Sequence, residues 1–375
     1  MKRTLLFVFG TRPEAIKLSP LIRRLRCSAA GHQVKVCVTA QHRQMLDQVL
    51  AAFDIQPDYD LDVMLPGQTL FQSTSRITAA LEPVFAAARP DMVLVQGDTT
   101  TTLCGALAAF YCGVPVGHVE AGLRTGDIRQ PFPEEMNRVL ASRLAALHFA
   151  ATEGAARNLG SEGITRNVWV TGNTGIDAVL YVRDRLEKGE LSAAAFPYLQ
   201  PGKRLVLVTA HRRESFGEGF ERICQALAAI AERDGVQVVY PVHPNPNVQA
   251  PVNRYLRSHP NITLIEPLDY VPFVDLMRRA HIIVTDSGGI QEEGPSLGKP
   301  IVVLREKTER PEAVEAGTVK LAGTDVGRIT GEVFKLLDDA DEYARMARIH
   351  NPYGDGHACE RIEAAIEEFW TNSSV

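Results

Sequence analysis

Short apolar segments alternate with amphipathic ones along the first half of the chain. Four segments that are apolar almost throughout cover residues 4–10, 34–40, 91–98 and 114–122. Stretches with apolar residues at helical spacing lie between them, at residues 14–26 and 43–53. Buried strands that alternate with helices are typical of a parallel sheet covered on both faces. The first half is therefore predicted to form an α/β domain.

The same pattern starts again after Gly202. Strands are predicted at residues 204–211, 236–244, 281–289 and 300–306. Helices are predicted at residues 220–233, 271–281 and 327–339, and a last amphipathic helix at 358–370. The segment 184–202 is polar and then rich in Pro and Gly, so it is predicted to connect the halves. The fold prediction is α/β, with two parallel sheets in tandem that form a central cleft where they face each other.

Length, composition and charge narrow the class of protein. A chain of 375 residues is too long for one ordinary core, which favours two domains. Its 45% apolar and 23% charged content is typical of a globular protein in water, and its net charge of −5 argues against nucleic-acid binding. None of the six cysteines forms a C-x-x-C pair, which favours free thiols in a reducing compartment.

The start of the chain does not have the pattern of a secretory signal. The apolar run at residues 5–9 is too short for one, and charge returns at Arg12. No run of about 18 apolar residues occurs anywhere, so no membrane span is predicted. We expect a cytoplasmic protein.

Polar side chains follow the predicted strands at their carboxyl ends. Ligands of open parallel sheets bind at this edge, so these residues are the first candidates for a site. They are Arg12, Glu14, Asp98, Glu120, His211, His243 and Ser287. Strand ends also meet polar loops for purely structural reasons, and that alternative stays open for each residue taken singly.

The turn in residues 285–300, "TDSGGIQEEGPSLGKP", indicates an anion site or a plain glycine-rich turn. Gly288 and Gly289 let the backbone approach a ligand, and a helix predicted to start at about Ile290 points its positive end there. The spacing matches neither a Walker A loop nor a dinucleotide fingerprint. Glu293 either accepts hydrogen bonds from ribose hydroxyls or interacts only with the helix dipole.

Further charged residues lie beside the first-half strands. Arg12 and Lys17 are candidate diphosphate cations or solvated helix charges. Asp98 and Glu120 are candidate acid–base groups, and Pro133 is predicted to open a helix with Glu134 near its start. Such carboxylates beside a diphosphate site suggest proton chemistry on the sugar of a nucleotide sugar.

Two histidines mark the second-half strands. His211 is followed by Arg212 and Arg213, and His243 lies in "PVHPNPNV"; each is a candidate phosphate contact or a structural histidine. No H-E-x-x-H or similar spacing occurs, so no metal is predicted.

Together these motifs resemble those of the bacterial non-hydrolysing UDP-N-acetylglucosamine 2-epimerases. They are "FGTRPEAIKLSPL", "TAQHRQMLDQVL", "GDTTTT", "GHVEAGLRTGD", "PFPEEMNR", "TAHRRES", "TDSGGIQEE", "PSLGKP", "TERPEA" and "NPYGDG". The resemblance implies a GT-B-type fold of two Rossmann-like domains, residues 1–170 and 171–357, with the helix at 358–375 returning to the first. It also implies a homodimer, no cofactor, and interconversion of UDP-N-acetylglucosamine and UDP-N-acetylmannosamine through UDP and 2-acetamidoglucal for surface polysaccharide synthesis.

The resemblance assigns roles to single residues. The acid–base set is Asp98, Glu120 and Glu134, and His211 assists departure of the diphosphate. The contacts to phosphate are Arg12, Lys17, Ser287, Gly288, Gly289 and Arg310. Glu293 binds the ribose, Phe273 packs on the uracil, and the backbone near Leu268 meets its edge.

The chain departs from these relatives at a few positions. Gln96 stands where many have His, and Gly294 where Ala is usual. Some relatives are activated by a second substrate molecule, and the matching positions are Gln41, Gln44, Arg212 and His243, whereas Gly67 replaces an arginine of that site. The alternatives are a hydrolysing 2-epimerase, a GT-B glycosyltransferase and a non-catalytic UDP-sugar sensor.

Overall fold

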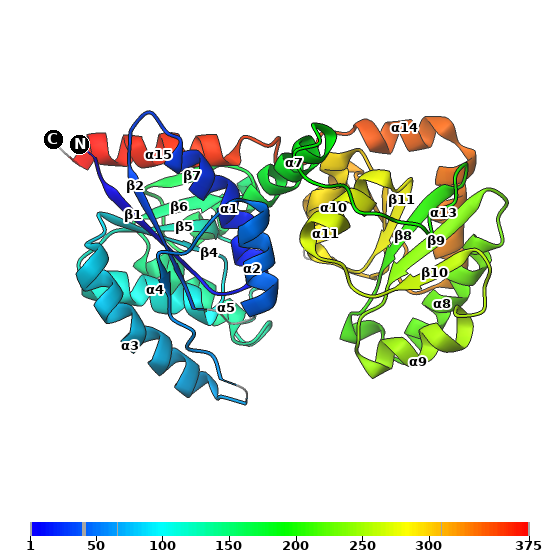
Figure 1. The fold of residues 1–375 in the computed structure, drawn as a ribbon, viewed down its shortest axis with the longest axis horizontal. Coiled ribbons are helices and arrows are strands. Elements are labelled where there is room, and N and C mark those ends of the chain that lie inside the picture. The colour runs from blue at the N-terminus through cyan, green and yellow to red at the C-terminus, as the bar shows by residue number, and fades with distance from the viewer. Residues whose placement is uncertain (1, 40–42, 66, 309, 374–375) are drawn as a thin grey trace. The chain divides into compact units, whose positions relative to one another are not determined.

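The computed structural model describes residues 2–39, 43–65, 67–308 and 310–373 of the chain (Figure 1). The chain divides into two compact units. Unit 1 comprises Met1–Ala178 and Gly354–Val375, and unit 2 comprises Val179–Tyr353. The division falls inside helix α7 (Thr174–Glu187), later than the expected boundary at residue 170. The first residues of the expected connection, 184–187, are accordingly the last turn of α7.

Unit 1 contains a parallel sheet of seven strands in the order β3-β2-β1-β4-β5-β6-β7. The strands are β1 (Thr4–Phe9), β2 (Gln33–Val38), β3 (Tyr59–Asp60), β4 (Met92–Gln96), β5 (Val116–Ala121), β6 (Leu147–Ala150) and β7 (Val168–Val170). The chain winds outward from β1 to one edge and then from β4 to the other. The switch point of this Rossmann-like sheet therefore lies between β1 and β4.

Helices cover both faces of this sheet. They are α1 (Arg12–Arg26), α2 (Arg43–Ala52), α3 (Leu70–Ala88), α4 (Thr100–Tyr111), α5 (Glu134–Leu144), α6 (Glu153–Ser161) and α15 (Ala358–Ser373). Helix α4 contacts α3 and α5, whereas α1 contacts α2 and α15. As predicted, α5 begins at Glu134 after Pro133. Thr99 caps α4 by accepting from the Thr102 N–H.

Helix α15 packs against α1 and beside the start of β1 (Figure 1). Arg24 forms ion pairs with Glu360 and Glu363. The Arg3 guanidinium lies 4.8 Å from the Trp370 ring centroid. The last helix therefore belongs to the core of unit 1.

Unit 2 contains a parallel sheet of six strands in the order β10-β9-β8-β11-β12-β13. The strands are β8 (Arg204–Thr209), β9 (Val236–Pro241), β10 (Ile262–Ile265), β11 (Ile282–Thr285), β12 (Ile301–Val303) and β13 (Val319–Leu321). The helical elements are η1 (Arg213–Ser215), α8 (Glu218–Ala231), α9 (Pro246–Tyr255), α10 (Tyr270–Arg279), α11 (Gly288–Glu293), η2 (Gly294–Leu297), α12 (Pro311–Ala316), α13 (Val326–Asp338) and α14 (Ala340–Arg348). Its switch point lies between β8 and β11.

The predicted α/β class with two parallel sheets is confirmed. The eight strands that were predicted from the sequence form the centres of the two sheets. The strands β3, β6, β7, β10 and β13 were not predicted. They have between two and four residues each, and in four of them a polar residue, Asp60, His148, Thr263 or Lys320, interrupts the apolar pattern. The helix expected from about Ile290 begins at Gly288 and ends at Glu293.

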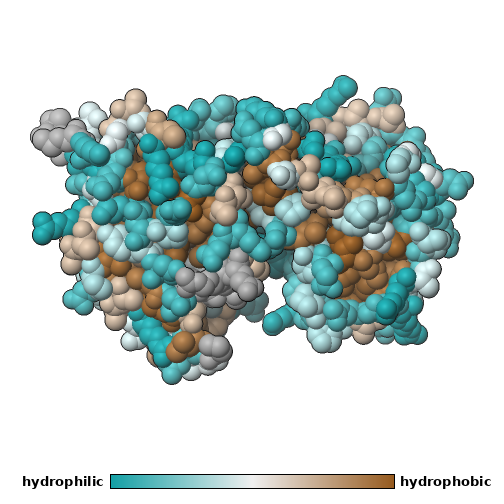
Figure 2. Space-filling model, in the orientation of Figure 1, coloured by the Kyte–Doolittle hydropathy of each residue, from teal (hydrophilic) through white to brown (hydrophobic). Residues whose placement is uncertain are grey.

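The face of the molecule drawn in Figure 2 is mainly hydrophilic, with hydrophobic patches between the polar side chains. The most exposed large apolar side chains are Phe71, Tyr111, Phe132 and Phe110. No helix in the described ranges is both long enough and apolar enough to cross a membrane.

Candidate functional site

The candidate residues of unit 1 gather at the carboxyl ends of β1, β4 and β5. Arg12 opens α1 directly after the loop that follows β1, and the loop after β4 carries Asp98, so both residues flank the switch point. Glu120 lies on β5, the next strand along. This is the edge of an open parallel sheet at which ligands bind.

Glu120 has a backbone conformation that is unusual for a residue with a side chain. Its φ is +62°, in the left-handed region. Val119 pairs with Phe149 and Ala121 with Ala150, so Glu120 is the extra residue of a β-bulge. A left-handed non-glycine residue costs about 1 kcal/mol or more, and such residues cluster at functional sites. The bulge therefore makes Glu120 a candidate functional residue.

Lys17 and Gln96 both donate to the Glu120 carboxylate. Lys17 Nζ lies 2.6 Å from Oε1 and 2.7 Å from Oε2. Gln96, the last residue of β4, donates from Nε2 to Glu120 Oε2. Lys17 thus binds Glu120 in this structure, and its expected phosphate contact remains a prediction.

Glu14 joins the loops after β1 and β4. It is buried, and its Oε2 accepts from the N–H groups of Gly10 and Thr11 at 3.0 and 2.7 Å. Its Oε1 accepts from Thr99 Oγ1 at 2.6 Å. Burial raises the pKa of this carboxyl, against the hydrogen bonds from its neighbours. Glu14 therefore ties the loop of Arg12 to the loop that carries Asp98, a role that sequence reasoning did not assign.

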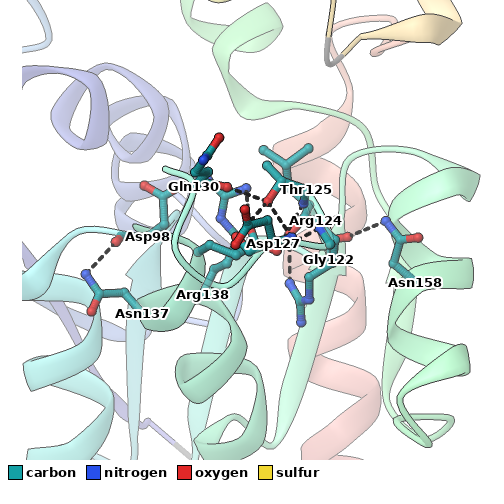
Figure 3. Close-up of polar contacts among 12 residues, drawn as sticks. Asp98, Gly122, Arg124, Thr125, Asp127, Gln130, Asn137, Arg138 and Asn158 are labelled. Carbon is teal, nitrogen blue, oxygen red and sulfur yellow. Dashed lines mark hydrogen bonds and ion pairs between the residues drawn. The ribbon is translucent and has the colours of Figure 1, made fainter. Parts of the chain in front are cut away.

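Asp98 is oriented by α5. Arg138 Nη2 donates to Asp98 Oδ2, and Asn137 Nδ2 donates to the Asp98 carbonyl at 2.9 Å (Figure 3). Arg138 also lies 3.2 Å from the buried Glu135 carboxylate. Glu134 is half-buried in the first turn of the same helix, one residue before Glu135. The helix that opens with Glu134 thus also fixes Asp98.

The loop after β5 is tied down on both sides. Arg124 donates from Nε to Glu162 at 2.7 Å. Asn158 Nδ2 donates to the Gly122 carbonyl at 3.0 Å (Figure 3). The Arg124 hydrogen bond holds the pKa of Glu162 below its usual value. Thr125 Oγ1 donates to the Gln130 carbonyl within the loop. The segment between Glu120 and α5 is therefore anchored at several points.

His118 lies beneath this cluster as a neutral side chain. It is fully buried on β5, and its Nε2 is 2.8 Å from the Gly97 carbonyl. Burial lowers its pKa from 6.5 to about 3, so the ring is uncharged at neutral pH and donates to Gly97. The turn between Gln96 and Asp98 is held by this bond.

We expect acid to weaken the fold through His118. Because its folded pKa is depressed, its contribution is complete above pH 6.5 and is lost as the pH falls towards about 3. Between pH 7.5 and 5.5 the free energy of unfolding should fall about 1.4 kcal/mol more for the wild type than for His118→Gln, which keeps a donor but does not titrate. Urea unfolding at the two pH values measures this difference. Equal losses in both proteins contradict it.

In unit 2, Asp286 organises the switch point. It is buried, and its Oδ2 accepts from the N–H groups of His211 and Arg212 at 2.6 and 2.7 Å. The His211 ring stacks on His243 with centroids 5.1 Å apart. Desolvation lowers the pKa of His211, while the Asp286 charge opposes that shift. The structure thus brings together His211, Arg212 and His243, as the sequence led us to expect for strand ends.

The glycine turn of unit 2 carries an arginine. A Cβ on Gly288 would lie 2.5 Å from Arg310 Nη1 and 2.7 Å from Nη2, so the guanidinium packs directly on this glycine. Arg310 Nε donates to the buried Glu292 at 2.6 Å. Asn351 Nδ2 in turn donates to the Glu292 carbonyl at 2.6 Å. The cation is therefore positioned at the start of α11.

The remaining candidates lie as follows. Ser287 precedes α11, Gly289 is its second residue and Glu293 its last; Phe273 is in the first turn of α10, after Leu268 in the preceding loop. Arg12 opens α1, where its Nη1 lies 3.9 Å from Met45 Sδ. Gln44 belongs to α2, and Gln41 lies outside the described residues. Within the described part of the chain, no group of three or more His, Cys, Asp or Glu could hold a metal ion.

The chain is similar to known proteins over nearly its whole length. A family model described as UDP-N-acetylglucosamine 2-epimerase matches residues 26–367. The UDP-N-acetylglucosamine 2-epimerase of Salmonella typhimurium is 58% identical over 370 residues, which cover 97% of this chain and 98% of that protein.

Solved structures give the same result. The crystal structure of UDP-GlcNAc 2-epimerase from Neisseria meningitidis bound to UDP-GlcNAc is 49% identical, with a TM-score of 0.88 over 97% of this chain and 100% of that one. The Methanocaldococcus jannaschii UDP-GlcNAc 2-epimerase in complex with UDP-GlcNAc and UDP is 33% identical, with a TM-score of 0.78 over 97% and 99%. The resemblance read from the motifs is confirmed: the chain belongs to the UDP-N-acetylglucosamine 2-epimerase family.

Proposed function

We propose that this protein interconverts UDP-N-acetylglucosamine and UDP-N-acetylmannosamine without hydrolysing them. The observation that carries the proposal is Glu120, which has a left-handed backbone conformation and accepts from Lys17 at the carboxyl edge of the unit 1 sheet, where Asp98 also lies. The chain belongs to the family whose members carry this name. A carboxylate placed by a strained bulge is suited to move a proton at one defined carbon.

The reaction proceeds by elimination and re-addition. Carbon 2 of the sugar is not next to a carbonyl, so its proton is not acidic enough for simple removal. A carboxylate takes that proton while the bond from carbon 1 to the UDP oxygen breaks, and the electron pair forms the double bond of 2-acetamidoglucal. A second group then protonates carbon 2 from the opposite face as UDP adds back to carbon 1. Asp98, Glu120 and Glu134 are assigned to these proton transfers.

Unit 2 is assigned the nucleotide half of the substrate. Ser287, Gly288 and Gly289 bind phosphate at the start of α11, with Arg310 beside Gly288. Glu293 accepts from the ribose hydroxyls, Phe273 packs on the uracil, and the backbone near Leu268 meets its edge. His211 and Arg12 stabilise the negative charge that develops on the departing UDP, as fixed charges and dipoles do in such sites.

The wider setting is part of the same proposal. Two copies of the chain form a homodimer in the cytoplasm, and the product supplies surface polysaccharide synthesis.

Turnover in deuterated water tests this function. We expect UDP-N-acetylglucosamine to yield the mannose-configured UDP-sugar by NMR, with deuterium at carbon 2 of both recovered sugars. Free N-acetylmannosamine and UDP as main products indicate a hydrolysing enzyme instead. Binding without any exchange indicates a sensor, and reaction only with an added acceptor indicates a glycosyltransferase.

A further inference from the structure

The side chain of Gln96 is not among the residues that the proposed mechanism uses. It closes β4 and is 3% exposed. Its Nε2 donates to Glu120 Oε2, and its carbonyl accepts from Thr102 Oγ1 at 2.6 Å. The strand and α4 therefore fix the backbone of Gln96, and its side-chain amide reaches the bulge on the neighbouring strand.

The donation from Lys17 and Gln96 favours the ionised state of Glu120. An ammonium group has no acceptor, and an amide NH₂ has donors alone. With Lys17 on both oxygens and Gln96 on Oε2, a proton on Glu120 would face a group that cannot accept it. A protonated Glu120 would require the Gln96 amide to turn its oxygen inward and Lys17 to withdraw.

Building on the proposed function, we propose that Gln96 is a positioning residue that, together with Lys17, keeps Glu120 ionised and aimed as the group that accepts the carbon 2 proton. Gln96 stays neutral at every pH, so it orients the carboxylate without adding a titration of its own. Lys17 supplies the positive charge that stabilises the Glu120 carboxylate, and Gln96 fixes the orientation of that carboxylate.

Other charged groups near the bulge have partners of their own. Asp98, in the loop after β4, is paired with Arg138 from α5. His118, on β5 itself, is neutral and bonded to Gly97. Glu14, from α1, faces Thr99. Among these contacts, Lys17 and Gln96 are the ones that reach the Glu120 oxygens.

The test is a pH titration of the Glu120 carboxyl by ¹³C NMR in the full chain, with the signal identified by its loss in Glu120→Gln. In the wild type the group should remain ionised through the neutral range. In Gln96→Leu the midpoint should rise by about one pH unit, the size expected for one hydrogen bond to a charged group. Gln96→Glu should raise it further because two carboxylates then face each other.

Kinetics give a second readout in the same proteins. The acid limb of kcat against pH should move up with the NMR midpoint, kcat at neutral pH should fall about tenfold, and KM should stay within about twofold. Gln96→His, which restores an N–H donor, should recover most of kcat. Gln237→Leu is the matched control: Gln237 is also a buried strand glutamine, and its Nε2 donates to the Tyr198 carbonyl in unit 2.

The outcomes separate the two proposals. An unmoved or lowered midpoint in Gln96→Leu, or an equal rise in Gln237→Leu, overturns the role of Gln96. If Gln96→Leu does not fold, Gln96→Met, which keeps the side-chain length but has no N–H donor, gives the same decision. A wild type that exchanges no deuterium overturns the proposed function, whereas the titration still reports on Gln96.

Discussion

Replacing Glu120 by glutamine should lower kcat for epimerisation by at least about a hundredfold, because general acid–base catalysis is worth about that much or more. Glutamine keeps the size of the side chain but cannot accept the carbon 2 proton. It also turns an amide towards Lys17 Nζ, which now lies 2.6 Å from Oε1. We expect KM to change much less than kcat, since the lost interaction stabilises the transition state of proton transfer and not the bound substrate. Initial rates by NMR or a coupled assay measure both.

Variants at the other two carboxylates and at a control position test whether the loss of rate is specific to the acid–base residues. Asp98→Asn and Glu134→Gln should each lose at least about tenfold in rate. Glu82→Gln, an exposed position on α3, should keep the wild-type rate. Wild-type rates in all three site variants would reject the acid–base assignment. Deuterium exchange at carbon 2 without epimerisation in one of them would show on which face that carboxylate acts.

The sequence predicted the fold class and the place of the site because both depend on periodicity. Apolar runs such as 204–211 and 300–306 are long enough to be recognised as buried strands. Polar residues after such strands must gather at one edge of a parallel sheet. Arg12 and Asp98 accordingly flank one switch point, and His211 and Ser287 the other.

The pairings inside the site were not predictable in this way. Lys17 is 103 residues from Glu120, and only the sheet order brings α1 to β5. The left-handed φ of Glu120 depends on a bulge that no glycine signals. Gln96 was noticed only as a departure from relatives, whereas its hydrogen bond depends on the register between β4 and β5. A buried glutamate at the third position of a helix, Glu14, reads from sequence as a capping residue alone.

At the glycine turn of unit 2, the sequence likewise did not predict a side-chain contact that the structure shows. The sequence predicted that Gly288 lets backbone approach a ligand. The structure shows that a protein group, the Arg310 guanidinium, also packs there, and Glu292 holds it from the following turn of α11. The absence of a side chain at Gly288 therefore serves the placement of a cation, in addition to any ligand.

Gly288→Ala should weaken UDP binding by about tenfold to a hundredfold, the range expected for one or two charged hydrogen bonds. The new methyl group would lie 2.5 Å from Arg310 Nη1, so the guanidinium must leave the turn. Its departure also breaks the 2.6 Å bond to Glu292, which is buried, and should lower the stability of unit 2. Calorimetric titration with UDP measures the affinity.

A glycine of unit 2 outside the turn provides the control for this change. Gly331→Ala adds the same methyl group on α13, where it would meet no atom within 4 Å. Gly331 is also a helical glycine, so the effect of alanine on helix propensity is shared. Arg310→Ala should reproduce the loss seen in Gly288→Ala, and combining the two changes should add little. Equal UDP affinities for the two alanine variants would show that Arg310 does not act through Gly288.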